Sequence, residues 1–232
     1  MELRGEVAVV TGGGRGIGRA ITLKLAAAGV RVALGARTEP EVRAVAAEVE
    51  RAGGVALPLP LDVTAADAVT RFAATVRAQL GEPLVLVNNA GVVIRGRLDE
   101  APTAAWDEVV ATNLTGTYLV TRAFLGGMRA RRRGRIVNVA SISGRQGTAQ
   151  LAAYCAAKHG VVGLTRALAE EVRDDGLQVN AVCPGSVATA MLGRGMPGAQ
   201  AVMNPDDVAR VVLFLAAAAP PALTGACLDV FG

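Results

Sequence analysis

The chain contains few aromatic residues, one histidine and three cysteines. Aromatic residues make up 3% of the 232 residues, and the cysteines Cys155, Cys183 and Cys227 are scattered. Such a set lacks metal-ligand spacing, so the sequence predicts no bound metal, and it is typical of thiols in a reducing compartment. The net charge of +4 is mild, and no basic stretch is interleaved with aromatic side chains, which argues against nucleic acid as a partner.

Long apolar runs are also absent. The longest, Val211 to Ala219, stops at Pro220-Pro221 and is too short to cross a bilayer. The first apolar run, Val7 to Val10, ends in glycines after four residues, unlike a targeting segment. We therefore expect a soluble cytoplasmic protein that has no membrane partner.

Short β-branched runs alternate with longer alanine-rich helical segments along the whole chain. The runs are apolar throughout, which indicates strands buried on both faces, as in a parallel sheet. The expected strands are Val7–Val10, Val30–Leu34, Val55–Leu61, Leu84–Val87, Arg135–Val139, Gln178–Val182 and Cys227–Val230. Short connections between strands and helices require parallel pairing through right-handed crossovers. No linker or repeat interrupts the pattern, so we predict one α/β domain spanning residues 1–232.

Local patterns mark where helices begin. Thr38 with Glu41 predicts a capping box, Thr64 with Asp67 nearly matches one, and Asn204 before Pro205 predicts a capped start.

A glycine-rich turn follows the first expected strand and opens a helix near Ile17. Its glycines Gly12, Gly16 and Gly18 would let backbone N–H groups approach a pyrophosphate, whose negative charge the helix dipole favours. A merely tight turn is the alternative, but the strand before the glycines and the helix after them favour a dinucleotide site.

The end of the second strand predicts which dinucleotide binds. A protein selective for NAD(H) places a carboxylate there for the ribose 2′-hydroxyl, but here the first acid is Glu39, which opens the next helix. Arg37 and Arg15 supply two cationic forks that suit a 2′-phosphate, which favours NADP(H). Asp62, before Val63 at the end of the third strand, could accept from the adenine amine or cap the next helix.

Tyr154 and Lys158 stand four residues apart in a helical segment, so their polar ends share one face. An ammonium about 4 Å from the phenol, at an effective dielectric near 20, favours phenolate by roughly 4 kcal/mol, about three pKa units. Burial opposes part of that shift. We predict that Lys158 lowers the pKa of Tyr154 and that Tyr154 exchanges a proton with a ketone or alcohol. A lone pair with this spacing is more commonly a surface pair.

Two further polar residues complete a candidate catalytic set. Ser141 follows the fifth strand, at the sheet edge where ligands bind, and could hold the substrate oxygen or cap a helix. Asn113 is an unfavourable polar residue within a long helix, which would be explained if it held a proton-relay water near Lys158.

The motifs occur in one order along the chain: Thr11-Gly12-x-x-x-Gly16-x-Gly18, Asn88-Asn89-Ala90-Gly91, Asn113, Ser141, Tyr154-x-x-x-Lys158 and Pro184-Gly185-x-x-x-Thr189. With them the chain resembles the classical short-chain dehydrogenases/reductases over essentially its whole length, and within that family the β-ketoacyl-acyl-carrier-protein reductases and related ketoreductases. It departs from those reductases at residues 147–153, which lack their usual Gly-Gln-x-Asn run.

The resemblance implies a catalytic tetrad of Asn113, Ser141, Tyr154 and Lys158. It also implies that Lys158 holds the nicotinamide ribose, and that Pro184, Gly185 and Thr189 position the nicotinamide. It likewise implies that Asn88-Asn89-Ala90-Gly91 braces the central strand beside the adenine ribose. The candidate cofactor-binding residues are Gly12, Arg15, Gly16, Ile17, Gly18, Arg37, Asp62, Val63, Asn89, Ala90, Gly91, Tyr154, Lys158, Pro184, Gly185, Val187 and Thr189.

Three other features of the sequence allow a structural or a functional interpretation. His159 turns away from the catalytic face, which predicts a packing or surface role. The basic residues of segment 129–135 would complement a helix dipole, or dock an acidic carrier protein. Residues 186–204, rich in glycine and with little periodicity, are expected to form a lid over the substrate.

The sequence thus predicts a Rossmann-type doubly wound domain with about seven strands in the order 3-2-1-4-5-6-7, which reduces a ketone with NADPH. A 3-oxoacyl-acyl-carrier-protein reductase is one candidate, and an alcohol, sugar or hydroxysteroid dehydrogenase working oxidatively is the alternative. A dinucleotide-binding regulator without turnover belongs to another class and conflicts with the complete tetrad. The expected partner is a small carbonyl or alcohol substrate, free or bound to a carrier protein, and the resemblance implies a homotetramer or homodimer.

Overall fold

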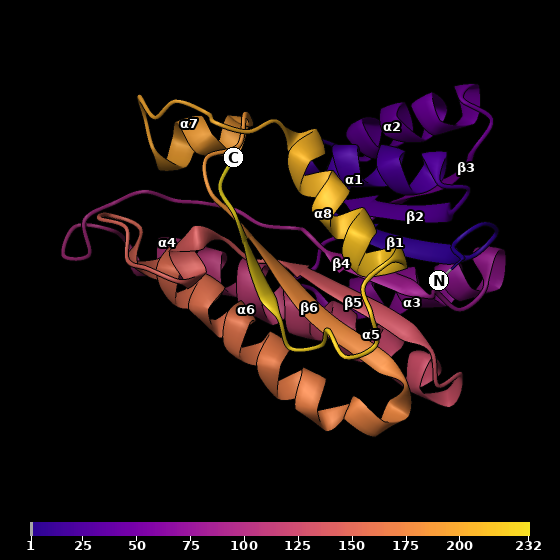
Figure 1. The fold of residues 1–232 in the computed structure, drawn as a ribbon. Helices are drawn as coiled ribbons and strands as arrows, with labels where there is room; N and C mark the ends of the chain where they lie inside the picture. Colours follow the sequence, from indigo (N-terminus) through magenta and orange to yellow (C-terminus); the bar gives the residue numbers. More distant parts are fainter. Residues whose placement is uncertain (1) are drawn as a thin grey trace.

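Every apolar run expected to be a strand forms one in the computed structural model, which describes residues 2–232 (Figure 1). The seven strands are all parallel and lie in the order β3-β2-β1-β4-β5-β6-β7, which confirms the predicted order and fold class. Their bounds are β1 Val7–Thr11, β2 Arg31–Ala36, β3 Val55–Pro60, β4 Val85–Asn88, β5 Gly134–Val139, β6 Leu177–Pro184 and β7 Cys227–Val230.

Helices cover both faces of the sheet (Figure 1). The main ones are α1 Gly16–Ala27, α2 Glu39–Arg51, α3 Ala66–Leu80, α4 Thr103–Val110, α5 Gly116–Ala130, α6 Ala152–Glu171, α7 Ala190–Gly195 and α8 Pro205–Ala217. Alternate side chains of β1 point to opposite faces: Ala8 and Val10 pack with α1 and α8, whereas Val7 and Val9 pack with α3, α5 and α6. Both faces of the central strands are therefore buried, as the continuous apolar runs predict.

The parallel topology brings the carboxyl ends of the strands to one edge. The strand order reverses at β1, since β2 and β3 lie on one side of it and β4 to β7 on the other. In open α/β sheets this reversal creates the crevice in which ligands bind. The residues after β1, β4, β5 and β6, which carry most candidate site residues, meet at this crevice.

Two of the three predicted helix caps differ in the structure. Thr38 precedes α2, but its side chain makes no capping hydrogen bond. Helix α3 begins after Ala65, because the backbone N–H and the hydroxyl of Thr64 both donate to Asp62 Oδ1, at 2.9 and 2.7 Å. This local turn competes with helix formation at Thr64.

The third cap forms as predicted. The Asn204 backbone N–H donates to the Asp207 carboxylate at 2.8 Å, and Pro205 occupies the first turn of α8.

Asn113 does not lie within one regular long helix. It belongs to a π-helical turn, Ala111–Thr115, that joins α4 to α5. Such a turn frequently occurs at functional sites because it re-aims a side chain that a regular helix would bury elsewhere.

Segment 186–204 has more order than its sequence indicates. It contains the short helix α7, and a parallel bridge between Val187 and Met203 closes its base. Met203 is 3% exposed and packs in the core beside α8, so it is no substrate contact.

The basic residues of segment 129–135 lie at the opposite edge of the sheet from the ligand crevice, because they flank the start of β5. Four of them contact the chain's own acidic side chains or carbonyl oxygens; the pairs are Arg129–Asp175 (2.7 Å), Arg131–Glu82 O (2.6 Å), Arg132–Asp174 O (2.6 Å) and Arg133–Glu6 (2.7 Å). These contacts tie segment 129–135 to neighbouring parts of the chain. Over residues 2–232, none of the helices combines the length and apolarity that a membrane span requires.

Candidate active site

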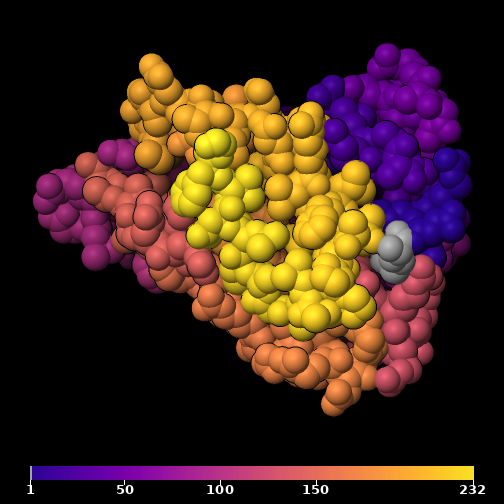
Figure 2. Space-filling view, in the orientation of Figure 1, coloured from indigo at the N-terminus to yellow at the C-terminus, as the bar shows by residue number. Residues whose placement is uncertain are grey.

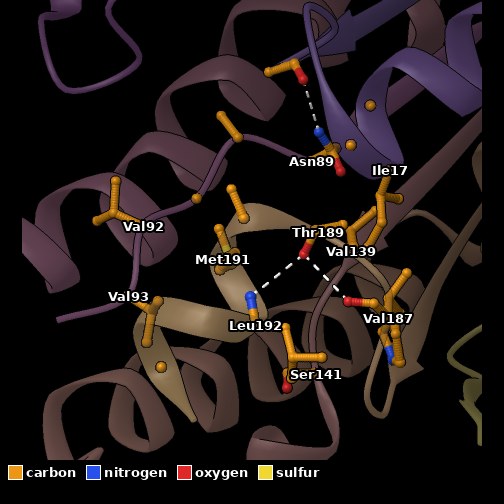
Figure 3. A pocket seen from close by; sticks show the side chains of 18 of the residues that line it. Ile17, Asn89, Val92, Val93, Val139, Ser141, Val187, Thr189, Met191 and Leu192 are labelled. Carbon is orange, nitrogen blue, oxygen red and sulfur yellow. Dashed lines mark hydrogen bonds between the residues drawn. The ribbon is translucent and has the colours of Figure 1, made fainter. Parts of the chain in front are cut away.

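A cavity of about 740 Å³ opens at the carboxyl edge of the sheet, beneath α7 (Figure 3). All predicted cofactor-binding residues line it, together with Ser141. Asn113 does not line the cavity and lies behind its wall, with 1% of its surface exposed. His159 lies outside the cavity, exposed on α6, where a ring nitrogen contacts the carbonyl oxygen of Cys155 at 2.9 Å.

The glycine turn has the geometry of a phosphate cradle. Gly12 and Gly16 have φ angles of +65° and +52°, a region that side chains disfavour. A methyl group added at Gly18 would lie 2.0 Å from the Gly12 carbonyl oxygen, so only glycine fits. The first turn of α1 contains no acidic residue, which leaves its N–H groups available to an anion.

Asn89 fastens this turn to β4. Its side-chain amide donates to the carbonyl oxygens of Thr11 and Gly12, at 2.9 and 3.1 Å (Figure 3). The backbone N–H groups of Asn89 and Ala90 both donate to the Thr11 hydroxyl at 3.0 Å. The cradle is thus braced by protein contacts alone, and its glycines and free N–H groups fit a dinucleotide.

Two arginines stand at the end of the cavity formed by β2. Arg37 is exposed, and Arg15 is 3.5 Å from Glu41 in a solvent-exposed ion pair. Glu39 pairs with Arg43 at 2.8 Å. Two carboxylates also line the cavity here, but each has a protein partner: Glu41 pairs with Arg15, and Asp62 accepts from Thr64.

Asp62 already has partners. Hydrogen bonds from the Thr64 side chain and backbone, and the charge of Arg37, hold the pKa of Asp62 below its ordinary value. Asp62 lines the cavity, and its bonds with Thr64 form a turn between β3 and α3 rather than a cap on α3.

Tyr154, Ser141 and Lys158 converge on the floor of the cavity. Tyr154 and Lys158 come from α6, and the Lys158 Nζ lies 5.7 Å from the centre of the Tyr154 ring. Lys158 is 5% exposed and donates to the carbonyl oxygen of Val139 at 2.7 Å. Ser141 follows β5, and its Oγ accepts from the Ser143 N–H at 3.1 Å, so it caps a short helical turn as well.

The expected lowering of the Tyr154 pKa is wrong for the protein's own groups. Burial raises the pKa of Tyr154 to about 12, against a smaller lowering by the hydrogen bond with Ser141. Burial also lowers the pKa of Lys158 to about 8. The Lys158 ammonium donates to the Val139 carbonyl oxygen, and desolvation outweighs charge attraction between the two groups. At neutral pH the phenol therefore keeps its proton.

Asn113 and Lys158 face each other across Gly91. The Asn113 amide donates to the carbonyl oxygens of Val92 and Val109, at 2.9 and 2.8 Å, which orients the side chain. Its Oδ1 is buried without a hydrogen-bond partner among the described residues. A methyl group added at Gly91 would lie 2.7 Å from that oxygen and 3.8 Å from Lys158 Nζ. Asn113 Oδ1 and Lys158 Nζ therefore both lie close to Gly91.

Segment 186–204, the expected lid, contributes Thr189 and its neighbours. The Thr189 hydroxyl donates to the Val187 carbonyl at 3.3 Å and accepts from the Leu192 N–H at 3.4 Å, which starts α7 (Figure 3). Arg95 holds the far end of the lid by donating to the Gly195 carbonyl at 3.1 Å.

Several lining residues were not found from the sequence. They include Val93, Gln146, Leu151 and Phe231. Phe231 follows β7, which no motif connects to the site. Among residues 2–232, no group of three or more histidine, cysteine, aspartate or glutamate side chains is arranged to hold a metal ion.

Comparisons with known proteins agree with this geometry. The short chain dehydrogenase family model matches residues 6–197. The chain is 39% identical to the 3-oxoacyl-[acyl-carrier-protein] reductase FabG of Pseudomonas aeruginosa, covering 100% of this chain and 98% of the relative. It is 37% identical to 2-(S)-hydroxypropyl-CoM dehydrogenase 3 of Xanthobacter autotrophicus, over 99% and 96% of the two chains.

Among solved structures, a variant of actinorhodin polyketide ketoreductase with NADPH superimposes with a TM-score of 0.93. The two share 38% sequence identity, and the match covers 98% of this chain and 96% of that one. The chain belongs to the short-chain dehydrogenase family, a family of oxidoreductases, as its motifs predict.

Proposed function

We propose that this protein reduces a ketone to a secondary alcohol with NADPH. The observation that carries the proposal is the convergence of Tyr154, Ser141 and Lys158 at the floor of a cavity that also contains the glycine cradle. The pKa of the partly buried Tyr154 is raised to about 12, so its phenol keeps its proton at neutral pH. A group that keeps its proton at neutral pH is suited to donate it to an oxygen on which negative charge develops.

Each member of the tetrad has one role in this reaction. Bound nicotinamide supplies the hydride that reaches the carbonyl carbon. Ser141 donates a hydrogen bond to the ketone oxygen and so orients it, and Tyr154 passes its phenolic proton to the same oxygen. Lys158, whose pKa of about 8 lies near the working pH, returns a proton to Tyr154. Asn113 Oδ1 holds the water through which protons reach Lys158.

The cofactor is NADPH rather than NADH, because two arginines lie at the end of the cavity that β2 forms. Arg15 and Arg37 take the 2′-phosphate, and the backbone N–H groups at Gly16 to Gly18 take the pyrophosphate. Relatives with known ligands support this choice, since the matched ketoreductase structure contains NADPH.

The substrate class is a 3-oxoacyl thioester or a related ketone. FabG of Pseudomonas aeruginosa is a 3-oxoacyl-[acyl-carrier-protein] reductase, and the matched structure is a polyketide ketoreductase. An oxidative alcohol dehydrogenase is the second candidate, because 2-(S)-hydroxypropyl-CoM dehydrogenase 3 is of comparable similarity. Rates measured in both directions at one pH distinguish the two.

Replacing Tyr154 by phenylalanine tests the proposal. Wild-type protein should oxidise NADPH in the presence of 3-oxoacyl thioesters, and Tyr154→Phe should lower kcat by about 10²–10⁴-fold because the proton donor is lost. The affinity for NADPH, measured by calorimetric titration, should change little. Full activity in the variant would refute the proposal.

The remaining expectations concern the whole protein. We infer that residues 1–232 act as one domain with residues 186–204 as the substrate lid, and that the protein works as a cytoplasmic homotetramer or homodimer. Light scattering coupled to gel filtration tests the oligomeric state.

A further inference from the structure

An apolar rim surrounds the mouth of the cavity on the lid side. Met196, Val202 and Phe231 line the cavity, yet they are 39%, 64% and 51% exposed. Exposed large apolar side chains gathered at one opening mark a binding surface rather than scattered surface residues. Two of them come from the lid, but Phe231 comes from the segment after β7.

The sheet itself sets the position of Phe231. Strand β7 pairs with the end of β6, with Val230 opposite Pro184, and the Gly185 N–H donates to the Val230 carbonyl at 2.9 Å. Phe231 therefore comes alongside Gly185, and a methyl group added at Gly185 would lie 3.3 Å from Phe231 Cδ1. The ring rests on the segment that follows β6.

The next residue is held against the lid. Gly232 has a φ of +87°, and a methyl group there would lie 2.7 Å from Met203 Cγ and 2.9 Å from the Val202 carbonyl oxygen. Figure 1 places the C-terminus beside α7, and Figure 2 shows the yellow C-terminal residues packed against the orange lid. The Phe231 ring is thus carried by backbone that both the sheet and the lid constrain.

The chemistry around this rim selects an apolar group. Leu151, Met191 and Leu192 also line the cavity. Arg194 is the one charged side chain between residues 186 and 204. A hydroxyl-rich substrate would need several hydrogen-bonding groups here, whereas a hydrocarbon chain gains by covering the exposed apolar surface.

We infer that Phe231 is a specificity-determining residue, whose ring binds the hydrocarbon chain of the ketone where that chain leaves the cavity. The inference rests on the proposed ketone reduction and adds to it the side of the cavity along which the chain extends. Phe231 packs on the chain and takes no part in proton transfer.

The test uses 3-oxoacyl-N-acetylcysteamine thioesters whose acyl chains lengthen from about four to about ten carbons in steps of two. Each step adds two methylene groups, whose transfer from water to an apolar surface is favourable. Full burial of one methylene is worth about 0.8 kcal/mol, or about fourfold in kcat/KM. Wild-type kcat/KM should rise by about twofold to fourfold per methylene until the chain extends beyond the rim. Phe231→Ala should abolish most of that rise, so that the ratio of kcat/KM between the longest and the shortest thioester falls toward one.

Two variants serve as controls. Phe231→Leu keeps an apolar side chain and should retain most of the chain-length dependence. Phe214, on α8 and outside the cavity, is 43% exposed, so Phe214→Ala removes a comparably exposed ring and should leave the dependence unchanged. Circular dichroism melting of each variant shows that the fold persists.

Dissociation constants provide a readout that does not need turnover. Calorimetric titration of the protein–NADPH complex with the corresponding 3-hydroxyacyl thioesters should give the same slope per methylene, again lost in Phe231→Ala. If the slope in either readout survives Phe231→Ala, or falls equally in Phe214→Ala, the inference is wrong. If wild-type protein binds the series with the predicted slope but reduces none of it, the proposed function fails while the inference stands.

Discussion

At the scale of single residues, burial decides the protonation states in the site. Tyr154 and Lys158 are close, but the surrounding protein solvates charge poorly. Burial therefore raises the pKa of Tyr154 and lowers the pKa of Lys158, which favours the neutral form of each side chain. Their pKa values therefore shift in the directions opposite to those expected of a phenolate–ammonium pair. The consequence is a phenol that is ready to give a proton and a lysine that titrates near the working pH.

Lys158 should make stability depend on pH. Its pKa is about 8 in the folded protein, against an ordinary value of 10.5 when the chain is unfolded. Below pH 8 both states bind the proton and the folded state bears the cost of a buried charge. Between about pH 8 and 10.5 only the unfolded state binds it, so stability rises with pH, by at most about 1.4 kcal/mol per pH unit.

Lys158→Met removes the titrating group. Denaturant unfolding of both proteins from pH 7 to 10 should show the wild-type free energy of unfolding increasing relative to that of the variant. Above pH 10 the raised pKa of Tyr154 opposes the trend in wild type, because unfolded tyrosine loses its proton first. Parallel curves for the two proteins between pH 8 and 10 would contradict the assigned shift.

Arg37 should set the choice of dinucleotide. Arg37→Asp replaces a cation at the end of β2 by a carboxylate, which repels a 2′-phosphate and accepts a hydrogen bond from a 2′-hydroxyl. We expect KM for NADPH to rise at least about tenfold, as the loss of one charge-assisted contact implies, and KM for NADH to fall. Arg43→Asp, on the exposed side of α2, is the matched control, and an unchanged preference in Arg37→Asp would show that another group reads the phosphate.

At the scale of elements, the turn between β1 and α1 depends on close backbone approach. Gly18 lies in the first turn of α1, directly over the Gly12 carbonyl, and Asn89 holds the same carbonyl from β4. The turn that contains Gly12 and Gly18 thus meets Asn89, which is distant in sequence. Any side chain at Gly18 must push them apart, so the cradle and the packing of the strands are linked.

Gly18→Ala should therefore cost both stability and cofactor affinity. The added methyl would meet Gly12 O at 2.0 Å, and relieving such a clash typically costs about 1–3 kcal/mol. Gly126→Ala is the control, since it lies in α5 with nothing within 4 Å and should stabilise the helix by about 0.5–1 kcal/mol. Thermal melting and NADPH titration measure both effects, and equal behaviour of the two variants would disprove the clash.

At the scale of the whole molecule, a buried polar chain crosses the otherwise apolar interior. The Asn88 amide donates to Asn138 on the next strand and to Thr121 on α5, at 2.9 and 2.8 Å. The Asn138 amide donates in turn to Thr165 on α6 at 2.9 Å. Two strands and two helices are thus tied directly beneath the site, just before Asn89 and Ser141 enter it.

Thr165→Val should weaken this tie. The variant leaves the Asn138 amide without its partner in the core, which costs about 1–3 kcal/mol and lowers Tm by a few degrees. Thr70→Val is a matched control, because both threonines donate to the carbonyl oxygen four residues before them. Thr165 does so in the core at 2.7 Å, and Thr70 does so on the exposed face of α3 at 2.9 Å. Its free energy of unfolding should change by less than about 0.5 kcal/mol, and a similar loss in both variants would argue against the network.

Much of the fold and of the site follows from local patterns. The strands, the glycine turn and the spacing of Tyr154 and Lys158 involve residues close together in sequence, and each repeats a known geometric rule. The predicted caps at Thr38 and Thr64 were wrong. The Thr38 side chain makes no capping hydrogen bond, and Thr64 donates to Asp62 in a competing turn. Phe231 was missed since its place depends on how β7 pairs with β6.

The amino-acid sequence by itself determined the positions of the strands, the dinucleotide cradle and which side chains could exchange a proton, because periodicity and short-range spacing act within one element. Only the tertiary structure decided the protonation of Tyr154, the orientation of Asn113 and the apolar rim around Phe231. Burial and long-range contacts arise only when distant elements pack together. The residues adjacent in sequence therefore do not indicate how packing changes a pKa or the exposure of a side chain.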